Sequence, residues 1–306
     1  MGLPQGAIVN ILITGGSGLI GQALIKRLQA DRIIVLTRNP EKSANVLPDN
    51  IELTSSLDEV DFNNLDVVVN LAGEAIVDKR WSSTQKNTIC QSRWQITQNL
   101  VDKIHAATTP PHSFISGSAI GFYGRQGPSA IDEAHQDIYD EFSHQVCQKW
   151  EAIAQQANSD KTRVCLIRTG IVLASNGGAL SKMLPAFRFG LGGPIANGQQ
   201  FMSWIHIDDM VAVLLAAIEQ PDLSGVINAT APTPVSNQKF SETLSTVLSR
   251  PCMFRVPAFV LRILLGESAD LILYGQNVLP RKLLDNHFKF QYPSLHKALT
   301  QLLLKS

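Results

Sequence analysis

The chain contains 306 residues, of which 44% are hydrophobic and 17% are charged. This composition is typical of a globular protein and excludes an intrinsically disordered one. The 26 lysines and arginines are balanced by 26 aspartates and glutamates, so no excess of positive charge attracts nucleic acid or an anionic membrane. The longest apolar run, Met210 to Ile218, is far shorter than the roughly 18 residues that cross a bilayer. We expect a cytoplasmic protein with neither nucleic acid nor a membrane as a partner.

The spacing of cysteine and histidine gives no sign of a metal site or of a disulfide framework. The four cysteines form no Cys-x-x-Cys pair, and the seven histidines form no His-x-x-x-His pair. Both spacings are common among metal ligands. We therefore expect no bound metal.

The first half of the chain alternates strand-like and helix-like segments. Apolar, β-rich runs predict buried parallel strands, and apolar residues at helical spacing predict helices between them. The predicted strands are 7–13, 32–36, 66–71, 113–116 and 163–168, and the predicted helices begin near Leu19 and cover 85–106 and 141–156. This alternation predicts an α/β fold, a Rossmann-type doubly wound parallel sheet.

After Arg168 the regular alternation of strand-like and helix-like segments ends. Glycine and proline punctuate the stretch from Gly177 to Gly198, which predicts loops. A short strand is predicted at 226–229, and amphipathic helices are predicted at 236–248, 257–265 and 295–304. We expect residues 1–170 and a return strand near 225–230 to form a dinucleotide-binding domain. Residues 171–224 and 231–306 then form a smaller, mainly helical substrate-binding region.

A glycine motif joins the first predicted strand to the first predicted helix. Gly15, Gly18 and Gly21 have the spacing that allows a tight turn, a close approach of backbone to a pyrophosphate and close packing of helix on sheet. The amino terminus of the helix would present N–H groups to the phosphates. We expect a dinucleotide here, contacted by Gly15, Ser17, Gly18, Leu19, Ile20 and Gly21.

The end of the second predicted strand distinguishes NADP from NAD. An acidic residue at that point would bind the ribose 2′-hydroxyl of NAD, but Thr37 and Arg38 stand there instead. A guanidinium group suits a 2′-phosphate. We therefore predict NADP as the cofactor; the alternative is that Arg38 is an ordinary solvated arginine.

Other predicted strands end in residues that would meet the cofactor at the same edge of the sheet. Ligands of open α/β sheets bind outside the carboxyl ends of the strands. The further cofactor candidates are Leu71, Ala72, Gly73, Ser116, Thr169 and Ile171.

Several of these motifs together resemble the extended short-chain dehydrogenase/reductases, in particular the NAD(P)-dependent epimerase/dehydratase family. They are residues 14–21, 70–73, 116–119 with 123–124, and 204–209. The strings at 70–74, 79–81, 92–93, 203–209 and 278–284 resemble more particularly the atypical YfcH-like subgroup. That resemblance implies NADP binding, a sugar-nucleotide-epimerase-like fold and a subgroup-specific carboxyl-terminal domain of unknown function at about 250–300.

The chain departs from this family at its acid/base motif. The family uses a Tyr-x-x-x-Lys pair on a helix, in which the positive charge lowers the pKa of the phenol. None of the four tyrosines is followed by lysine four residues later. If Ser118 matches the family's catalytic serine, the pair falls on Ser143 and Cys147, neither of which can replace the tyrosine unaided.

Two residues remain as catalytic candidates. The resemblance implies that Ser118 hydrogen-bonds the reacting oxygen of a substrate beside the nicotinamide. Tyr123 is the nearest phenol and a candidate substitute acid; the alternative is a buried, hydrogen-bonded tyrosine.

Two further ionisable residues lie in or beside the motifs. Glu74 could serve as a base if desolvation raised its pKa, or it could be a solvated or helix-capping residue. His206 lies in an apolar stretch, where a core histidine bonded to backbone is the alternative to a substrate contact.

A cationic and aromatic group lies on the predicted catalytic edge. Lys79, Arg80, Trp81 and Arg93 would suit a substrate that carries phosphate or carboxylate. The alternative is a structural network of ion pairs.

These observations predict an NADP-dependent oxidoreductase or epimerase-like enzyme that acts on a small polar substrate, either a nucleotide sugar or another anionic molecule. The alternative is a non-catalytic NADP-binding protein that regulates or binds a protein partner. Plastid relatives of the subgroup are implicated in organelle division, so the resemblance implies a possible link to cell division.

Overall fold

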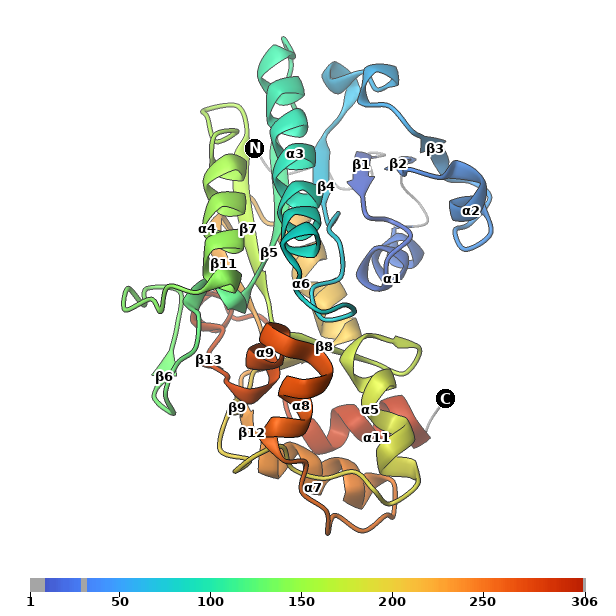
Figure 1. Cartoon of the computed structure of the whole chain (residues 1–306). Coiled ribbons are helices and arrows are strands. Elements are labelled where there is room, and N and C mark those ends of the chain that lie inside the picture. The colour runs from blue at the N-terminus through green and yellow to red at the C-terminus, as the bar shows by residue number, and fades with distance from the viewer. Residues whose placement is uncertain (1–8, 29–31, 305–306) are drawn as a thin grey trace.

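A computed structural model describes residues 9–28 and 32–304 of the chain. Within these residues the central sheet has seven strands in the order β11-β7-β5-β4-β1-β2-β3, and all neighbours are parallel (Figure 1). The strands are β1 (Asn10–Thr14), β2 (Arg32–Leu36), β3 (Glu52–Thr54), β4 (Val67–Asn70), β5 (Ser113–Ala119), β7 (Arg163–Thr169) and β11 (Gly225–Ala229). The strand order reverses between β1 and β4, which marks a doubly wound sheet. The predicted fold class is confirmed.

Two helical layers cover the sheet because its strands are apolar on both faces. In β1, Ile11 and Ile13 pack in one core with α1 (Leu19–Arg27) and α6 (Ile207–Glu219). Leu12 packs on the opposite face with α3 (Ser83–Ala106) and α4 (Phe142–Gln155). Alternate residues of each strand therefore stabilise different layers.

Most elements of this domain start or end within a few residues of their predicted positions. The first strand begins at Asn10, and positions 7 and 8 of the prediction lie outside the described residues. β5 continues three residues beyond the predicted end at Ser116. That extension places Ser118 in the strand, next to Arg168 of β7.

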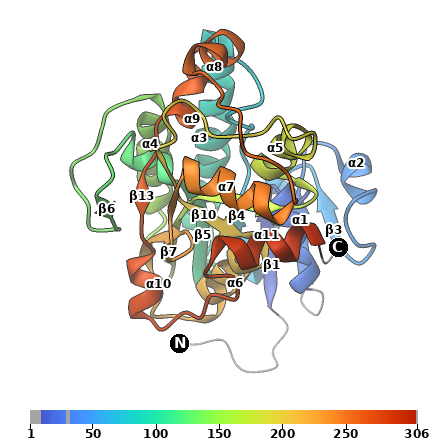
Figure 2. The same cartoon turned by 90° about the horizontal axis from the view of Figure 1, so that it is seen from below.

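Most of the remaining elements are helices and short strands at the carboxyl ends of the sheet strands (Figures 1 and 2). The helices are α2 (Pro40–Ala44), α5 (Gly178–Arg188), α7 (Asn237–Val247), α8 (Ala258–Leu265), α9 (Asp270–Leu273), α10 (Arg281–Asp285) and α11 (Leu295–Leu304). Of these, α10 instead packs beside β11, near the amino end of that strand. The short strands are β6 (Ala130–Ile131), β8 (Ile171–Ala174), β9 (Phe201–Met202), β10 (Trp204–His206), β12 (Val235–Ser236) and β13 (Asn277–Val278). Single 3-10 turns occur at Leu57–Glu59, Phe62–Asn64, Ile120–Tyr123 and Gly266–Ala269.

One part of the prediction for this half is wrong. The stretch from Gly177 to Gly198 is not all loop, because α5 occupies its first half. Leu180, Leu184 and Phe187 form a buried stripe on that helix. Their i, i+4, i+7 spacing is the helical signal that the surrounding glycines and prolines obscured.

Helix α8 is present as predicted, but its apolar face is uncovered. None of its residues is buried, and Phe259, Ile263 and Leu264 are exposed. No helix within the described residues is both long and apolar enough to cross a membrane.

Candidate functional site

The turn between β1 and α1 has the geometry of a phosphate cradle. Gly15 has φ +70°, and a Cβ there would lie 2.6 Å from the carbonyl oxygen of Leu71. A Cβ on Gly21 would lie 2.4 Å from the carbonyl oxygen of Gly15. Both positions therefore require glycine.

The amino terminus of α1 is open to an anion. Its cap is Gly18, which has no side chain to bond the first-turn N–H groups, and the first turn contains no acidic residue. Ser17 and Gly18 are exposed. The first N–H groups of a helix have no partner within it, and they favour a phosphate. The residues present thus fit the diphosphate of a dinucleotide.

At the end of β2, the side chain of Thr37 is hydrogen-bonded within the protein, whereas that of Arg38 is exposed. The Thr37 hydroxyl shares a 2.7 Å hydrogen bond with the Ser43 hydroxyl, and the Thr37 N–H donates to Thr54. Arg38 is exposed and forms no ion pair with any residue that the structure describes. Its guanidinium group is available to a ligand at this edge.

A buried polar group holds the end of β4 against β1. Asn70 accepts a 2.7 Å hydrogen bond from the Thr14 hydroxyl and donates to Thr97. Thr14 also accepts from the N–H of Ala72 at 3.2 Å. Leu71, Ala72 and Gly73 therefore leave the sheet in a fixed path beside the glycine turn.

The other cofactor candidates lie at the neighbouring strand ends. Ser116 is fully buried, and its hydroxyl donates to the carbonyl of Gly117 at 3.3 Å. Thr169 and Ile171, at the junction of β7 and β8, are partly buried.

Ser118 belongs to a buried charged group that the sequence did not predict. Its hydroxyl donates to Glu151 Oε1 at 2.6 Å. Arg168 donates to both oxygens of the same carboxylate at 2.8 Å. The Glu151 and Arg168 side chains are only 8% and 5% exposed. Two charges seventeen residues apart gave no local signal of this pairing.

Ser143 and Cys147, the positions expected to replace the Tyr-x-x-x-Lys pair, have side chains that are bonded or protonated. Ser143 donates to Glu141 at 2.8 Å. Burial raises the pKa of the Cys147 thiol to about 12, so it stays protonated at neutral pH.

Tyr123 does not point into an open site. It is fully buried, and its hydroxyl donates to Asn228 Oδ1 at 2.9 Å. Burial is the largest cause of a raised phenol pKa, which makes proton release harder. This arrangement fits the structural alternative for Tyr123.

The residues of the predicted cationic and aromatic group do not form one site, because each of them contacts different neighbours. Arg80 donates to the carbonyl of Ile263 in α8 at 3.0 Å. Trp81 donates to the carbonyl of Ile76 and packs edge-on against Phe142. These two residues join the loop after β4 to its surroundings.

Glu74 does not meet the electrostatic condition set for a base. Lys79 donates to its carboxylate at 3.0 Å, and this bond is the largest cause of a lowered Glu74 pKa. The condition for a basic role, a pKa raised by desolvation, is therefore not met, because the bond to Lys79 outweighs the effect of burial.

His206 is a core residue. It is fully buried, caps α6 by accepting the N–H of Asp208 at 3.0 Å, and pairs with Gln301 of α11 at 2.9 Å. Its ring stacks on Tyr292 with centroids 3.8 Å apart. Because protein groups enclose the ring, this arrangement fits the core-histidine alternative for His206.

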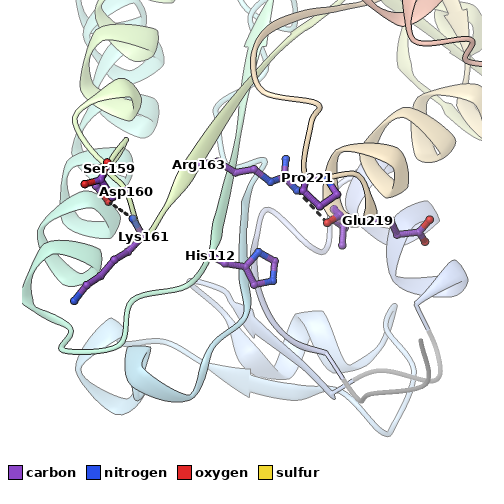
Figure 3. Close-up of a pocket in the computed structure, with 8 residues that line it drawn as sticks. His112, Ser159, Asp160, Lys161, Arg163, Glu219 and Pro221 are labelled. Carbon is purple, nitrogen blue, oxygen red and sulfur yellow. Dashed lines mark hydrogen bonds between the residues drawn. The ribbon is translucent and has the colours of Figure 1, made fainter. Parts of the chain in front are cut away.

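A pocket near the amino ends of the strands is not part of this site. His112, which precedes β5, and Arg163, at the start of β7, contribute to its lining (Figure 3). Arg163 is occupied by carbonyl oxygens, including that of Leu223 at 2.6 Å. The glycine turn and Ser118 lie at the opposite ends of the strands.

Comparisons with known proteins agree with this geometry. A sequence profile of the NAD dependent epimerase/dehydratase family matches residues 11–229, and a profile of a domain of unknown function matches residues 256–302. The chain is 40% identical to an Arabidopsis thaliana chloroplastic homolog of epimerase family protein SDR39U1, over 95% of this chain and 86% of that protein.

Solved structures show the same likeness. The human epimerase family protein SDR39U1, crystallised with NADPH, is 32% identical and superposes with a TM-score of 0.90, covering 97% of this chain and all of that chain. A UDP-glucuronic acid 4-epimerase from Bacillus cereus, solved with UDP-glucuronic acid and NAD, is 16% identical with a TM-score of 0.76, over 96% of this chain and 98% of that one. The second likeness shows a shared fold alone.

Proposed function

Because the chain belongs to the NAD-dependent epimerase/dehydratase family, we propose that it is an NADP-dependent oxidoreductase or epimerase-like enzyme that acts on a small polar substrate. The observation that carries the proposal is the open helix terminus at Gly18, with Arg38 free at the neighbouring strand end. A nicotinamide cofactor held there would accept or donate hydride.

Arg38 supports NADP rather than NAD. An exposed guanidinium group can bind a 2′-phosphate by two charge-assisted hydrogen bonds, and the NADPH complex of the human relative is consistent with this choice. We expect Arg38→Ala to weaken NADP binding by about 10- to 100-fold, since charge-assisted bonds contribute about 1.5–3 kcal/mol. NAD affinity should change by less than about twofold.

Calorimetric titration with both dinucleotides tests this assignment. Lys26→Ala is a matched control, because Lys26 is an exposed cation in the last turn of α1, away from the glycine turn. Equal losses of NAD and NADP affinity in Arg38→Ala would contradict the assignment.

We propose that Ser118 forms a hydrogen bond with the reacting oxygen of the substrate. The only hydroxyl proton of Ser118 is donated to Glu151, so the serine oxygen can accept a hydrogen bond from a substrate hydroxyl. This geometry favours a substrate that arrives as an alcohol. Tyr123, whose hydroxyl is buried on Asn228, is assigned no proton transfer.

A non-catalytic, NADP-binding regulatory protein is the second candidate. The serine and the protonated thiol at positions 143 and 147 favour it, because neither supplies the acid/base group of the family's enzymes. Both candidates require stoichiometric NADP binding, so turnover must separate them. A metabolite screen that follows NADPH absorbance should reveal a reaction that Ser118→Ala weakens; firm NADPH binding without turnover across the screen would favour the regulatory protein.

A further inference from the structure

Arg93 of α3 lies at the cofactor edge of the sheet. Its guanidinium group rests on the backbone of Gly73, just after β4: a Cβ on Gly73 would lie 2.9 Å from Arg93 Cζ. On another side, Cζ lies 5.3 Å from the ring centre of Trp150. The missing side chain at position 73 makes room for the guanidinium group.

Protein groups within the described residues use only part of the Arg93 guanidinium group. Nη1 donates to the carbonyl of Ile89 at 3.0 Å, with a longer contact to Ser92. Nε and Nη2 have no hydrogen-bond acceptor among the described residues, and no described carboxylate forms a salt bridge with Arg93. The carboxylate of Glu74 is already paired with Lys79.

Arg93 is partly buried, and this partial loss of water makes the missing salt bridge unfavourable. Desolvation is the largest cause of a lowered Arg93 pKa. A cation removed from water is disfavoured unless an anion pairs with it. The unused N–H groups of Nε and Nη2 form one edge of a rigid fork that matches the oxygens of a carboxylate or a phosphate.

The surroundings connect Arg93 to the proposed reaction site. Cys147 stands where the family's motif would carry its lysine, and the positive charge of Arg93 lowers the pKa of that thiol against the larger effect of burial. A Cβ on Gly117, the residue before Ser118, would lie 3.2 Å from the ring of Trp150, the same ring that Arg93 faces. Arg93 therefore brings a cation, from a different helix, to the neighbourhood in which the motif's cation is missing.

We infer that Arg93 binds an oxyanion of the substrate, a carboxylate or a phosphate, close to the oxygen held by Ser118. This inference rests on the proposed function and names the substrate class: a polar alcohol or carbonyl compound with an acidic group near its reacting carbon. No proton or electron transfer is assigned to Arg93, which orients the substrate by its fork of donors.

The test measures binding of oxalate and of inorganic phosphate by calorimetry, to the cofactor-free protein and to the NADP-saturated protein. Arg93→Gln should weaken binding of the preferred anion by about 10- to 100-fold. Arg93→Lys, which keeps the charge but loses the fork, should lie between Arg93→Gln and wild type. Preference for oxalate indicates a carboxylate substrate, and preference for phosphate indicates a phosphorylated one.

Lys103→Gln is the matched control, because Lys103 is a cation near the far end of α3 that pairs with Asp58 at 2.6 Å. It should bind both anions as wild type does. The inference is overturned if both Arg93 variants retain wild-type anion affinity. It is also overturned if they lose NADP affinity by the same factor, since the anion would then belong to the cofactor.

Failure of the proposed function is a separate result. It would appear as absence of NADP binding to the wild-type protein, whereas the anion titrations of the cofactor-free protein would still report on Arg93.

Discussion

The buried ion pair between Arg168 and Glu151, beside Ser118, should contribute strongly to the stability of the protein. Arg168 forms two 2.8 Å bonds with Glu151, and both side chains are less than a tenth exposed. Arg168→Met would leave the carboxylate with the Ser118 hydroxyl as its remaining bonded partner. Breaking a buried pair in this way costs about 3–5 kcal/mol. Since domains are stable by about 5–15 kcal/mol, this is a large fraction of the free energy of unfolding.

Urea denaturation of four proteins measures the effect. They are wild type, Arg168→Met, Glu151→Leu and the double variant. The double variant should recover much of the loss, because apolar side chains of similar volume replace a buried pair at little cost. The loss of unfolding free energy in the double variant should therefore be smaller than the sum of the losses in the two single variants.

An exposed pair provides the matched control. Arg32 and Glu52 are 2.9 Å apart, but their side chains are 51% and 56% exposed. Arg32→Met should cost less than about 1 kcal/mol, because water screens an exposed pair. The reasoning is refuted if Arg168→Met costs no more than Arg32→Met, or if the double variant loses the full sum of the single losses.

Three further predictions concern single side chains. Tyr123→Phe should lower the free energy of unfolding by about 1–3 kcal/mol in urea titrations, since it leaves Asn228 Oδ1 without its buried hydrogen-bond donor. The variant should bind NADPH as tightly as wild type does. A loss of NADPH affinity without a loss of stability would contradict a structural role. Burial lowers the pKa of His206 in the folded protein below its ordinary 6.5. As the pH falls, the unfolded chain therefore binds a proton at His206 before the folded protein does. The contribution of His206 to the free energy of unfolding is highest above pH 6.5 and decreases on acidification. Unfolding midpoints of wild type should therefore fall more between pH 7.5 and 5.5 than those of His206→Asn, and parallel curves would disprove this. Gly21→Ala should reduce NADP affinity in calorimetric titrations and cost about 1–3 kcal/mol of stability, because its Cβ would overlap the Gly15 carbonyl; an unchanged protein would show that the turn is looser than described.

Local signals in the sequence were enough for the cofactor half of the protein. The geometry of the β1–α1 turn depends on residues within a few positions of one another, so the spacing of Gly15 and Gly21 in the sequence predicts it directly. The apolar runs of the parallel strands likewise identify a sheet buried on both faces. Where local signals conflict, as the glycines and prolines do around α5, burial of one helical stripe in the tertiary structure decides the outcome.

The chemistry of the site was decided by contacts between distant elements. Glu74 could have been a desolvated base, but its ion pair with Lys79 lowers its pKa. His206 could have faced a substrate, but α11 and Tyr292 enclose it. Arg93 was one of several cations in the sequence, and only the fold leaves it partly desolvated and without a salt bridge among the described residues. Burial and pairing set the reactivity of an ionisable group, and both depend on residues that the chain brings together only when it folds.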